Sequence, residues 1–503
     1  MRSLLLGPFL VLGIVLTTLF LYSTHVRQDV VDSSSFSFAD ESLFAAMRVT
    51  NSPPVDGVPV RFEGHQVWRV AIASLTDLDR INTLQEQVFD LTHLLFVNTK
   101  PIPKVPTLDY WTDPRIGRHG VDIRVAAGAR DVIASYLNKF SLAYEVFIPD
   151  VQDAIDTQLY DTPHHSREKN IQQHLMDSTV DSAADPTKTY HTKYHPISEV
   201  NEYLIYVSTT YPDIVELFSI GETFEGRKQW GVHIRSPAGE DVPSKKEKKE
   251  FVFFGGHHAR EWIGPAVVQY ILTDLVVKYG KDKAITDALD SFDFTIIPVL
   301  NVDGYEYTHS TNRMWRKNRQ PNQGNTCVGT DPNRNWDTNW GGDGTTSRNP
   351  CSDSFIGAAP FSAPEPRNIA NYLKSRNGNV ISFVDFHAYS QLWMYPFGSH
   401  CDIFADVNVE KAAQAAASAL KAVHGKSFAV GSICKIIYQA SGSSVDWAYE
   451  SANVTFSYGL ELRDQGLYGF LLPPKQIVPS GEETLAGVLE LVKFVKGYLK
   501  DHS

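Results

Sequence analysis

The feature that constrains the fold most is a strand-to-helix junction near the middle of the chain. The unbroken apolar run at 251–254 is typical of a strand buried on both faces of a sheet. Two glycines follow at 255–256, and the mixture of apolar and polar residues at 263–279 predicts a helix. His258 and Glu261 lie between the two elements, which is the usual place for a site in an open α/β sheet.

His258 and Glu261 are three residues apart, so they could bind one metal ion from one short segment. The pattern is weak alone, because most such pairs are a surface histidine and a solvated glutamate. Its position after a buried strand and two glycines strengthens it. A second histidine, His387, ends the apolar strand predicted at 380–387. Hydrolytic zinc sites use three protein ligands and leave a fourth position for water, so the set predicts a zinc hydrolase.

The composition limits the classes of protein to consider. A length of 503 residues predicts two or more domains, and 43% hydrophobic with 21% charged residues is typical of a globular protein. The net charge of −12 gives no support for nucleic-acid binding, which favours a basic patch. The 4 cysteines allow two disulfide bonds but no disulfide-dense scaffold.

The N-terminus predicts export. Arg2 precedes an apolar run at 4–22, and polar residues follow, so 1–23 is interpreted as a secretory signal peptide. The run is long for such a signal and no clear cleavage site follows it, so an uncleaved signal anchor is the alternative. Either way the bulk of the chain would leave the cytosol. A secreted protein is predicted, with a vacuolar or membrane-anchored one as alternatives.

Residues 58–156 predict a small α+β domain after a linker at 24–57. Its predicted strands are 68–72, 121–125 and 144–148, with 94–97 as the candidate for a fourth, and its predicted helices are 77–89 and 129–140. This order is the ferredoxin-like arrangement. No catalytic cluster occurs here, so the domain is expected to fold, cover or inhibit something else.

The remainder predicts a connector and one larger domain. Residues 157–189 lose apolar periodicity, and Arg167, Lys169 and Lys188 offer sites for trypsin-like cleavage. Residues 190–503 alternate strands and helices, which predicts one mixed α/β domain. The predicted helices are 197–210, 263–279, 363–375, 407–424 and 482–499, and the predicted strands are 229–234, 251–254, 294–300, 380–387 and 455–461.

Seven ordered segments resemble the zinc carboxypeptidase A/B family. They are His258-Ala-Arg-Glu-Trp-Ile, Asn301-Val-Asp-Gly-Tyr, Arg313-Met-Trp-Arg-Lys, Asp331-Pro-Asn-Arg-Asn-Trp, His387-Ala-Tyr-Ser-Gln, Ile437-Tyr-Gln-Ala-Ser-Gly and Leu460-Glu-Leu-Arg-Asp. The resemblance spans nearly all of 190–503, while 58–156 resembles the family's inhibitory propeptide more loosely. It implies a mixed central sheet flanked by helices, a ferredoxin-like prodomain and one Zn²⁺ per chain.

The resemblance also implies residue roles. His258, Glu261 and His387 match the zinc ligands, and Asp331 matches a carboxylate that orients a ligating imidazole. Glu461 matches the general acid/base and Arg316 the cation that stabilises the oxyanion. The residues that match the substrate-binding positions are Asn333 and Arg334 for the C-terminal carboxylate, Tyr438 closing over the substrate, and Arg260 as a more distant carboxylate-binding residue. For Arg260 a structural salt bridge is nearly as plausible, and His257 is interpreted as a bystander.

Two further features follow from the resemblance. Val445 occupies the position where basic-specific relatives carry a carboxylate, which favours aromatic or aliphatic C-terminal residues in the substrate. Gly459 replaces a commoner hydroxyl residue and could deepen the pocket. Cys327 and Cys351 match a family disulfide, which leaves Cys401 and Cys434 as the second pair.

The leading hypothesis is a secreted zymogen of a zinc carboxypeptidase. Its expected partners are peptide or protein C-termini as substrate, its own propeptide as inhibitor and an activating protease, and nothing requires more than a monomer. The first alternative is a catalytically silent relative that binds zinc or peptides. The second is a zinc amidase acting on cell-wall peptides. The presence of Glu461 argues against the silent relative, and the complete carboxylate-recognition set argues against the amidase.

Overall fold

The computed structural model describes residues 58–96, 108–160, 189–237, 248–342 and 346–502. The predicted signal segment, the linker and most of the connector lie outside the described residues. The described residues belong to one compact unit, and they form one sheet of four strands and one of eight. Across the described ranges, every helix is too short or too polar to cross a lipid bilayer.

The four-stranded sheet belongs to the small N-terminal domain, and its strand order is β2-β3-β1-β4. The elements, in chain order, are β1 (Gln66–Ile72), α3 (Leu75–Phe96), β2 (Leu108–Tyr110), β3 (Gly117–Val125), α4 (Arg130–Lys139) and β4 (Tyr144–Ile148). All three strand pairings are antiparallel. The predicted strand–helix–strand–strand–helix–strand order is therefore confirmed.

The prediction of a strand at 94–97 is wrong. Residues 94–96 are the last turn of α3, and the missing edge strand is β2. A short apolar run cannot be assigned to a strand or to a helix end by periodicity alone, which explains the error. The helix α5 (Val151–Tyr160) follows β4 and continues past residue 156, the predicted end of the small domain.

The eight-stranded sheet has the order β11-β10-β12-β9-β7-β8-β6-β5 and is mixed. The four strands β12, β9, β7 and β8 at its centre run parallel to one another. The strands are β5 (Val215–Glu222), β6 (Lys228–Ile234), β7 (Glu250–Gly255), β8 (Asp293–Ile297), β9 (Val380–His387), β10 (Leu392–Tyr395), β11 (Ala429–Ser432) and β12 (Phe456–Glu461). All five predicted strands are present. The three that were not predicted lie toward the edges, where they are short or only partly buried.

The predicted helices of the larger domain are also present. They are α8 (Ile197–Thr210), α9 (Ile263–Lys278), α12 (Pro364–Ser375), α13 (Val407–His424) and α16 (Ile477–Asp501). The helix α16 begins five residues before the predicted start, with Pro479 in its first turn. Proline is tolerated there because the first backbone N–H groups of a helix have no intrahelical partner. Among the described residues of this domain, four shorter helices were not predicted: α10 (Lys283–Ser291), α11 (Val302–Ser310), α14 (Ile433–Ile436) and α15 (Ser444–Glu450).

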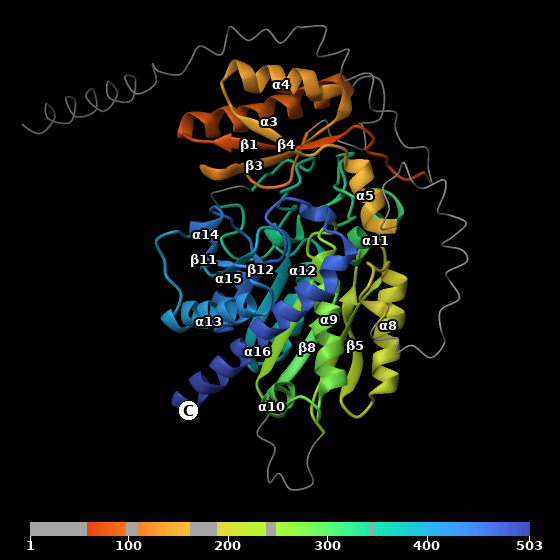
Figure 1. Cartoon of the computed structure of the whole chain (residues 1–503), viewed down its shortest axis with the longest axis vertical. Helices are drawn as coiled ribbons and strands as arrows, with labels where there is room; N and C mark the ends of the chain where they lie inside the picture. Colours follow the sequence, from red (N-terminus) through yellow and green to blue (C-terminus); the bar gives the residue numbers. More distant parts are fainter. Residues whose placement is uncertain (1–57, 97–107, 161–188, 238–247, 343–345, 503) are drawn as a thin grey trace, which may run out of the picture. The chain divides into compact units, whose positions relative to one another are not determined.

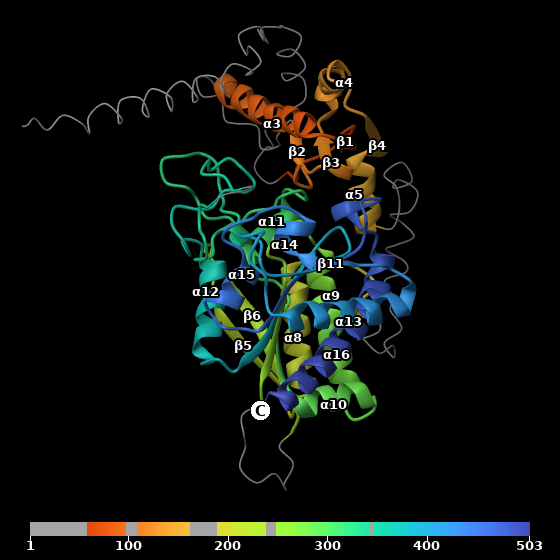
Figure 2. The same ribbon diagram turned by 90° about the vertical axis from the view of Figure 1, so that its left-hand side faces the viewer.

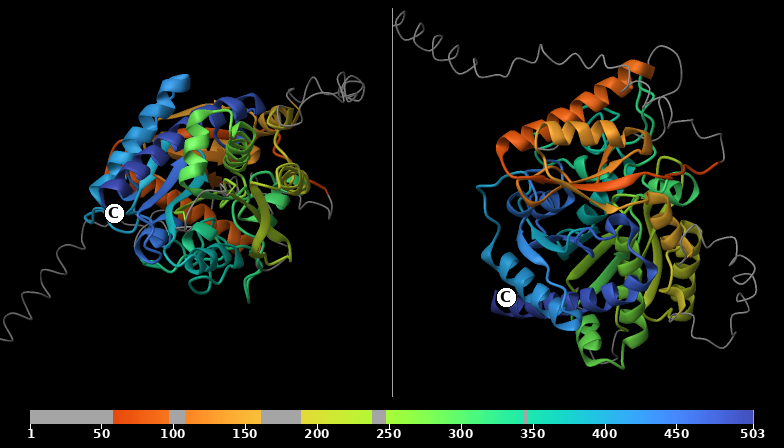
Figure 3. Two further views of the ribbon diagram at one scale, coloured as in Figure 1. Left: turned by 90° about the horizontal axis from the view of Figure 1, so that it is seen from below. Right: turned by 45° about the horizontal axis from the view of Figure 1, so that its top comes forward.

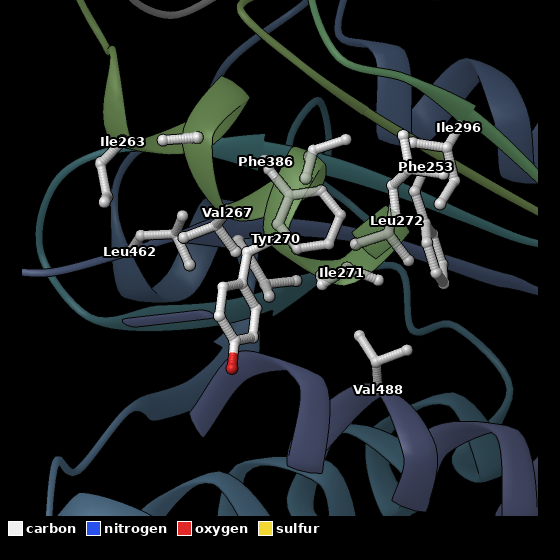
Figure 4. Close-up of a cluster of buried hydrophobic side chains, with 14 of the residues drawn as sticks. Phe253, Ile263, Val267, Tyr270, Ile271, Leu272, Ile296, Phe386, Leu462 and Val488 are labelled. Atoms are coloured by element: carbon white, nitrogen blue, oxygen red, sulfur yellow. The ribbon is translucent and has the colours of Figure 1, made fainter. Parts of the chain in front are cut away.

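Helices cover both faces of this sheet (Figures 1 and 2). The alternation of β7 decides which residues face which layer: Phe251 and Phe253 belong to the core cluster that contains residues of α8, α9, α13 and α16, whereas Val252 and Phe254 belong to the cluster that contains residues of α12 and α15. The two further views in Figure 3 show the sheet between its helices. In Figure 4, Val267 and Ile271 of α9 lie among side chains of the sheet, and Val488 of α16 lies below them. A strand buried on both faces explains the unbroken apolar run in its sequence.

The fold places three strand ends side by side. The strands β7, β9 and β12 are adjacent and parallel, Glu461 pairs in register with His387, and Gly255 pairs with Phe386. Close packing of α9 against this edge depends on Gly264, because a Cβ atom there would lie 2.5 Å from the carbonyl oxygen of Phe386. The chain turns out of β7 at Gly256, which has a φ of +67°. The junction therefore directs polar side chains to the carboxyl edge of the sheet.

Candidate active site

The side chains of His258, Glu261 and His387 converge at this edge. Their ligand atoms lie within 4.8 Å of one another, and all three residues are buried. The Nδ1 atom of His258 is 2.8 Å from Glu261 Oε1, the Nδ1 atom of His387 is 2.9 Å from Glu261 Oε2, and the two Nδ1 atoms are 3.1 Å apart. Two imidazole nitrogens and a carboxylate that face one point form a donor set that fits a zinc ion.

A carboxylate lies on the far side of each imidazole. His258 Nε2 is 3.1 Å from Asp331 Oδ1, and His387 Nε2 is 2.9 Å from Asp385 Oδ2. Carboxylates paired with the outer nitrogen are typical of metal-bound histidines. Asp331 was predicted for this position from resemblance, but Asp385 was not. The signal for Asp385 was present in the sequence, because residues two apart on a strand share a face.

The electrostatics of Glu261 and His387 favour a cation. Burial opposes the charged form of Glu261, but His258 and His387 outweigh it and hold the pKa of this carboxyl well below its usual range. Burial also opposes the charged form of His387, but Asp385 and Glu261 raise its pKa well above the ordinary value. The pocket therefore attracts positive charge, as a metal site must.

Glu461 ends β12 beside His387, and it lines the same cavity as the three candidate ligands. The side chain is partly buried, and its Oε2 atom has no hydrogen-bond partner within the described part of the chain. Burial, and then the charge of Glu261, raise the pKa of Glu461 to about 8. The position suits a group that must gain and lose a proton near neutral pH.

Arg316 and Arg334 line the cavity as well. Arg316 donates from Nη2 to Asp331 Oδ2 at 2.8 Å, and its Nη1 atom is 3.9 Å from Glu261 Oε1. Arg334 donates from Nη2 to the hydroxyl oxygen of Tyr438 at 2.9 Å. The Nε atom of Arg334 is buried, and no acceptor for it is found among the residues that the structure describes. A buried guanidinium N–H without an acceptor fits an anionic ligand.

Asn333 lies between the candidate ligands and the part of the cavity that Arg334 lines. Its Oδ1 atom accepts from the backbone N–H of Ser444 at 2.9 Å, and its Nδ2 atom lies 3.2 Å from His387 Nε2. The local turn is fixed by Asp331, whose Oδ1 atom accepts from the backbone N–H of Asn333 at 2.9 Å. Two successive residues thus have different roles: Asn333 lies beside the candidate metal ligands, and Arg334 offers a cation to an anionic ligand.

The other end of the cavity is apolar. Val445 is 3% exposed and packs with Leu392, Met394 and Ile433. Gly459 also lines the cavity, and a Cβ atom there would lie 3.4 Å from Val445 Cγ2, in ordinary van der Waals contact. The absence of that atom leaves additional room beside Val445.

The small domain forms part of the cavity wall through Trp111, Thr112, Asp113 and Arg115. Arg115 donates from Nη1 to the carbonyl oxygen of Ile436 at 3.0 Å. Burial, and then the charge of Asp113, raise the pKa of the Tyr438 hydroxyl. Four residues that precede the predicted connector therefore contact the cavity in which the candidate site residues lie.

Two further side chains of the larger domain, Arg260 and Tyr389, pair with carboxylates of the small domain. Arg260 donates from Nη1 to Asp109 Oδ1 at 2.9 Å, and Tyr389 donates its hydroxyl to Asp122 at 2.6 Å. Arg260 is 1% exposed, so in this form of the chain it makes a salt bridge and is closed to solvent. These pairings had no signal in the sequence, because each joins residues more than 100 positions apart.

Both predicted disulfides are formed. Cys327 is bonded to Cys351 and Cys401 to Cys434, and no cysteine is free. The first bond closes the loop that carries Asp331 and Arg334. The bond therefore restricts the conformation of the segment that joins the candidate metal ligands to the part of the cavity that Arg334 lines.

Comparison with known proteins identifies the two domains. The zinc carboxypeptidase family model matches residues 200–487, and the carboxypeptidase activation peptide model matches residues 100–158. Carboxypeptidase A2 of Mus musculus is 38% identical over 398 residues, covering 78% of this chain and 88% of its own. A metallocarboxypeptidase A-like protein of Trichophyton verrucosum is 37% identical over 393 residues, covering 77% of this chain and 88% of its own.

Solved structures agree with this fold. The crystal structure of thrombin activatable fibrinolysis inhibitor has a TM-score of 0.71 and 28% identity, covering 86% of this chain and 98% of its own. The carboxypeptidase A of Helicoverpa armigera has a TM-score of 0.69 and 26% identity, with the same coverage of 86% and 98%. With both family models matched in order on one chain, the protein belongs to the zinc carboxypeptidase family and is the zymogen form of a metallocarboxypeptidase.

Proposed function

We propose that the catalytic domain at 190–503 hydrolyses the last peptide bond of peptides or proteins, with a preference for aromatic or aliphatic C-terminal residues. The observation that carries this proposal is that two residues lining one cavity, Arg334 and Glu461, each have a buried polar atom, Nε and Oε2, without a hydrogen-bond partner among the described residues. Arg334 offers a cation to a terminal carboxylate, and Glu461 offers a base to the reacting centre. The three candidate zinc ligands, His258, Glu261 and His387, line the same cavity.

Substrate binding would begin with the terminal carboxylate. The guanidinium of Arg334 matches a carboxylate with two parallel N–H donors, and Asn333 can add a third donor once its side chain turns toward the substrate. Tyr438 would leave its hydrogen bond with Arg334 to cover the bound residue. The C-terminal side chain would enter the apolar end beside Val445, where a cation would lack a partner.

Catalysis would then depend on proton transfer and charge stabilisation by this chain's own residues. When bound, zinc supplies a Lewis acid that polarises the scissile carbonyl and acidifies a water molecule. Glu461 takes the proton of the attacking water and delivers it to the nitrogen of the leaving residue. Arg316 stabilises the negative charge that develops on the carbonyl oxygen.

The small domain, proposed to comprise 58–156, would inhibit the enzyme by occupying the substrate side of the cavity with Trp111, Thr112, Asp113 and Arg115. Cleavage in the connector at 157–189 by an activating protease would release it. The predicted signal segment and two disulfide bonds support export to an oxidising compartment. The enzyme is proposed to act as a monomer.

The experiment that tests this function is hydrolysis of blocked dipeptides that end in Phe, Leu, Arg or Lys. The full chain is treated by limited proteolysis, and release of the last residue is measured with and without a zinc chelator. We expect chelator-sensitive release of Phe and Leu only after proteolysis. No release from a cleaved, zinc-loaded protein would contradict the proposal and favour a silent binding protein.

Substituting Val445 by aspartate is expected to reverse the substrate preference. A carboxylate at the apolar end of the cavity would pair with the positive charge of a basic C-terminal side chain. We expect the ratio of kcat/KM for Arg over Phe to rise by about 10²-fold, because a buried polar partner discriminates strongly. Val445→Asn is the matched control, because asparagine has the shape of aspartate without its charge. An equal rise in the Arg-over-Phe ratio in that variant would contradict the argument.

A further inference from the structure

Two groups of opposite hydrogen-bonding character face the outer nitrogen of His387. Asp385 Oδ2 lies 2.9 Å from His387 Nε2, and Asn333 Nδ2 lies 3.2 Å from the same atom. The Asn333 amide is oriented by its Oδ1 atom, which accepts from the backbone N–H of Ser444 at 2.9 Å. The nitrogen of Asn333 is therefore a donor aimed at Nε2, whereas the carboxylate of Asp385 can only accept.

The choice between these partners decides where the imidazole proton lies. A neutral imidazole carries one N–H. If Nε2 accepts from Asn333, the proton lies on Nδ1, which faces His258 and Glu261 and would then be closed to a metal. If Nε2 donates to Asp385, the Nδ1 lone pair faces the same two residues and is free to bind. Only the second tautomer makes His387 a ligand together with His258 and Glu261.

Asp385 is itself held in place by a second, fully buried layer. Its Oδ2 atom accepts from His257 Nδ1 at 2.7 Å and from Ser444 Oγ at 2.6 Å. His257 carries its proton on Nδ1, because its Nε2 atom accepts from Trp336 Nε1 at 3.4 Å. Asp385, His257 and Ser444 have no exposed surface. His257, interpreted from sequence as a bystander, is thus joined to the candidate ligand through one carboxylate oxygen.

We propose that Asp385, oriented by His257, is a positioning residue that sets the tautomer of His387 and so opens Nδ1 to the metal. The inference rests on the proposed function in one respect, the assignment of His387 as a ligand. It assigns a task to a histidine–aspartate pair that does not touch the substrate. It also gives each of the two imidazoles in the metal group its own carboxylate, since Asp331 serves His258.

The first test is the zinc affinity of Asp385→Asn in the full chain, measured by competition with a chromophoric chelator. We expect affinity to fall about 10- to 100-fold, the usual effect of removing a carboxylate behind a metal-bound histidine. Asp446→Asn is the matched control: Asp446 is also fully buried and accepts from Gly398 and Ser399, away from the ligands. Unchanged zinc affinity in folded Asp385→Asn would overturn the inference.

A charge-relocation variant separates tautomer control from general damage. Adding Asn333→Asp to Asp385→Asn places a carboxylate where the competing donor stood, about 3 Å from His387 Nε2. We expect the double variant to recover most of the lost zinc affinity, although its hydrolytic activity stays low because Asn333 is part of the proposed carboxylate site. A double variant that binds zinc no better than Asp385→Asn would count against tautomer control.

The role of His257 is tested by a pair of substitutions. His257→Asn keeps an N–H donor at the Nδ1 position, whereas His257→Leu removes it. We expect zinc affinity near wild type in the first and several-fold weaker in the second, with a changed visible spectrum of the Co²⁺-loaded protein only in the second. Equal spectra and affinities would overturn the role of His257. If His387→Ala bound zinc like wild type, the ligand assignment of the proposed function would fail instead.

Discussion

Glu461→Gln is expected to lose about 10²- to 10⁴-fold in kcat, the range that general acid/base catalysis contributes. The amide has the shape of the carboxylate but cannot take the proton of the attacking water. Zinc content is expected to stay at one per chain, because Glu461 is not among the three residues whose ligand atoms converge with one another. The measurement is kcat on a blocked dipeptide ending in Phe, after removal of the small domain, together with metal analysis of the same sample.

The matched control for this substitution is Glu365→Gln. Glu365 is fully buried at the start of α12, accepts from Asn318 Nδ2 at 2.8 Å, and burial raises its pKa to about 7. It therefore resembles Glu461 in its raised pKa but lies outside the cavity. We expect kcat in this variant to remain within a few-fold of wild type. Near-wild-type activity in Glu461→Gln, or an equal loss in both variants, would refute the role given to Glu461.

The sequence predicted the centre of the fold better than its edges. The buried strands β7 and β9 and the helices α8 and α13 have strong apolar patterns, and their positions were predicted to within about a residue. The strands β10 and β11 were missed because four residues give too short a pattern for periodicity to detect.

The residues that line the site were predicted from resemblance, but their mutual arrangement was not. His258 and His387 lie 129 positions apart, and only the adjacency of β7 and β9 brings their Nδ1 atoms within 3.1 Å. Asp385 was overlooked although it lies on the same face of β9 as His387. Contacts of the small domain, such as that between Asp109 and Arg260, depend on the tertiary packing of two separately patterned segments.

Arg334→Met is expected to reduce kcat/KM on peptides with a free C-terminus by about 10²- to 10³-fold, which corresponds to the loss of one buried, hydrogen-bonded charge pair. Methionine retains much of the length of the arginine side chain and removes its charge and donors. Arg334→Lys keeps the charge but lacks the two parallel donors, so we expect an intermediate loss. The measurement is kcat/KM on a blocked dipeptide ending in Phe.

The control for Arg334 lies in the substrate rather than in the protein. The same dipeptide with a C-terminal amide cannot form the charge pair, so wild-type enzyme should discriminate strongly in favour of the acid. In Arg334→Met the partner of the carboxylate is gone, and the ratio of kcat/KM for acid over amide should approach one. Because both substrates meet the same metal group and the same Glu461, any general damage to the site would lower both rates and leave their ratio intact. A preserved ratio would therefore show that another cation recognises the terminal carboxylate.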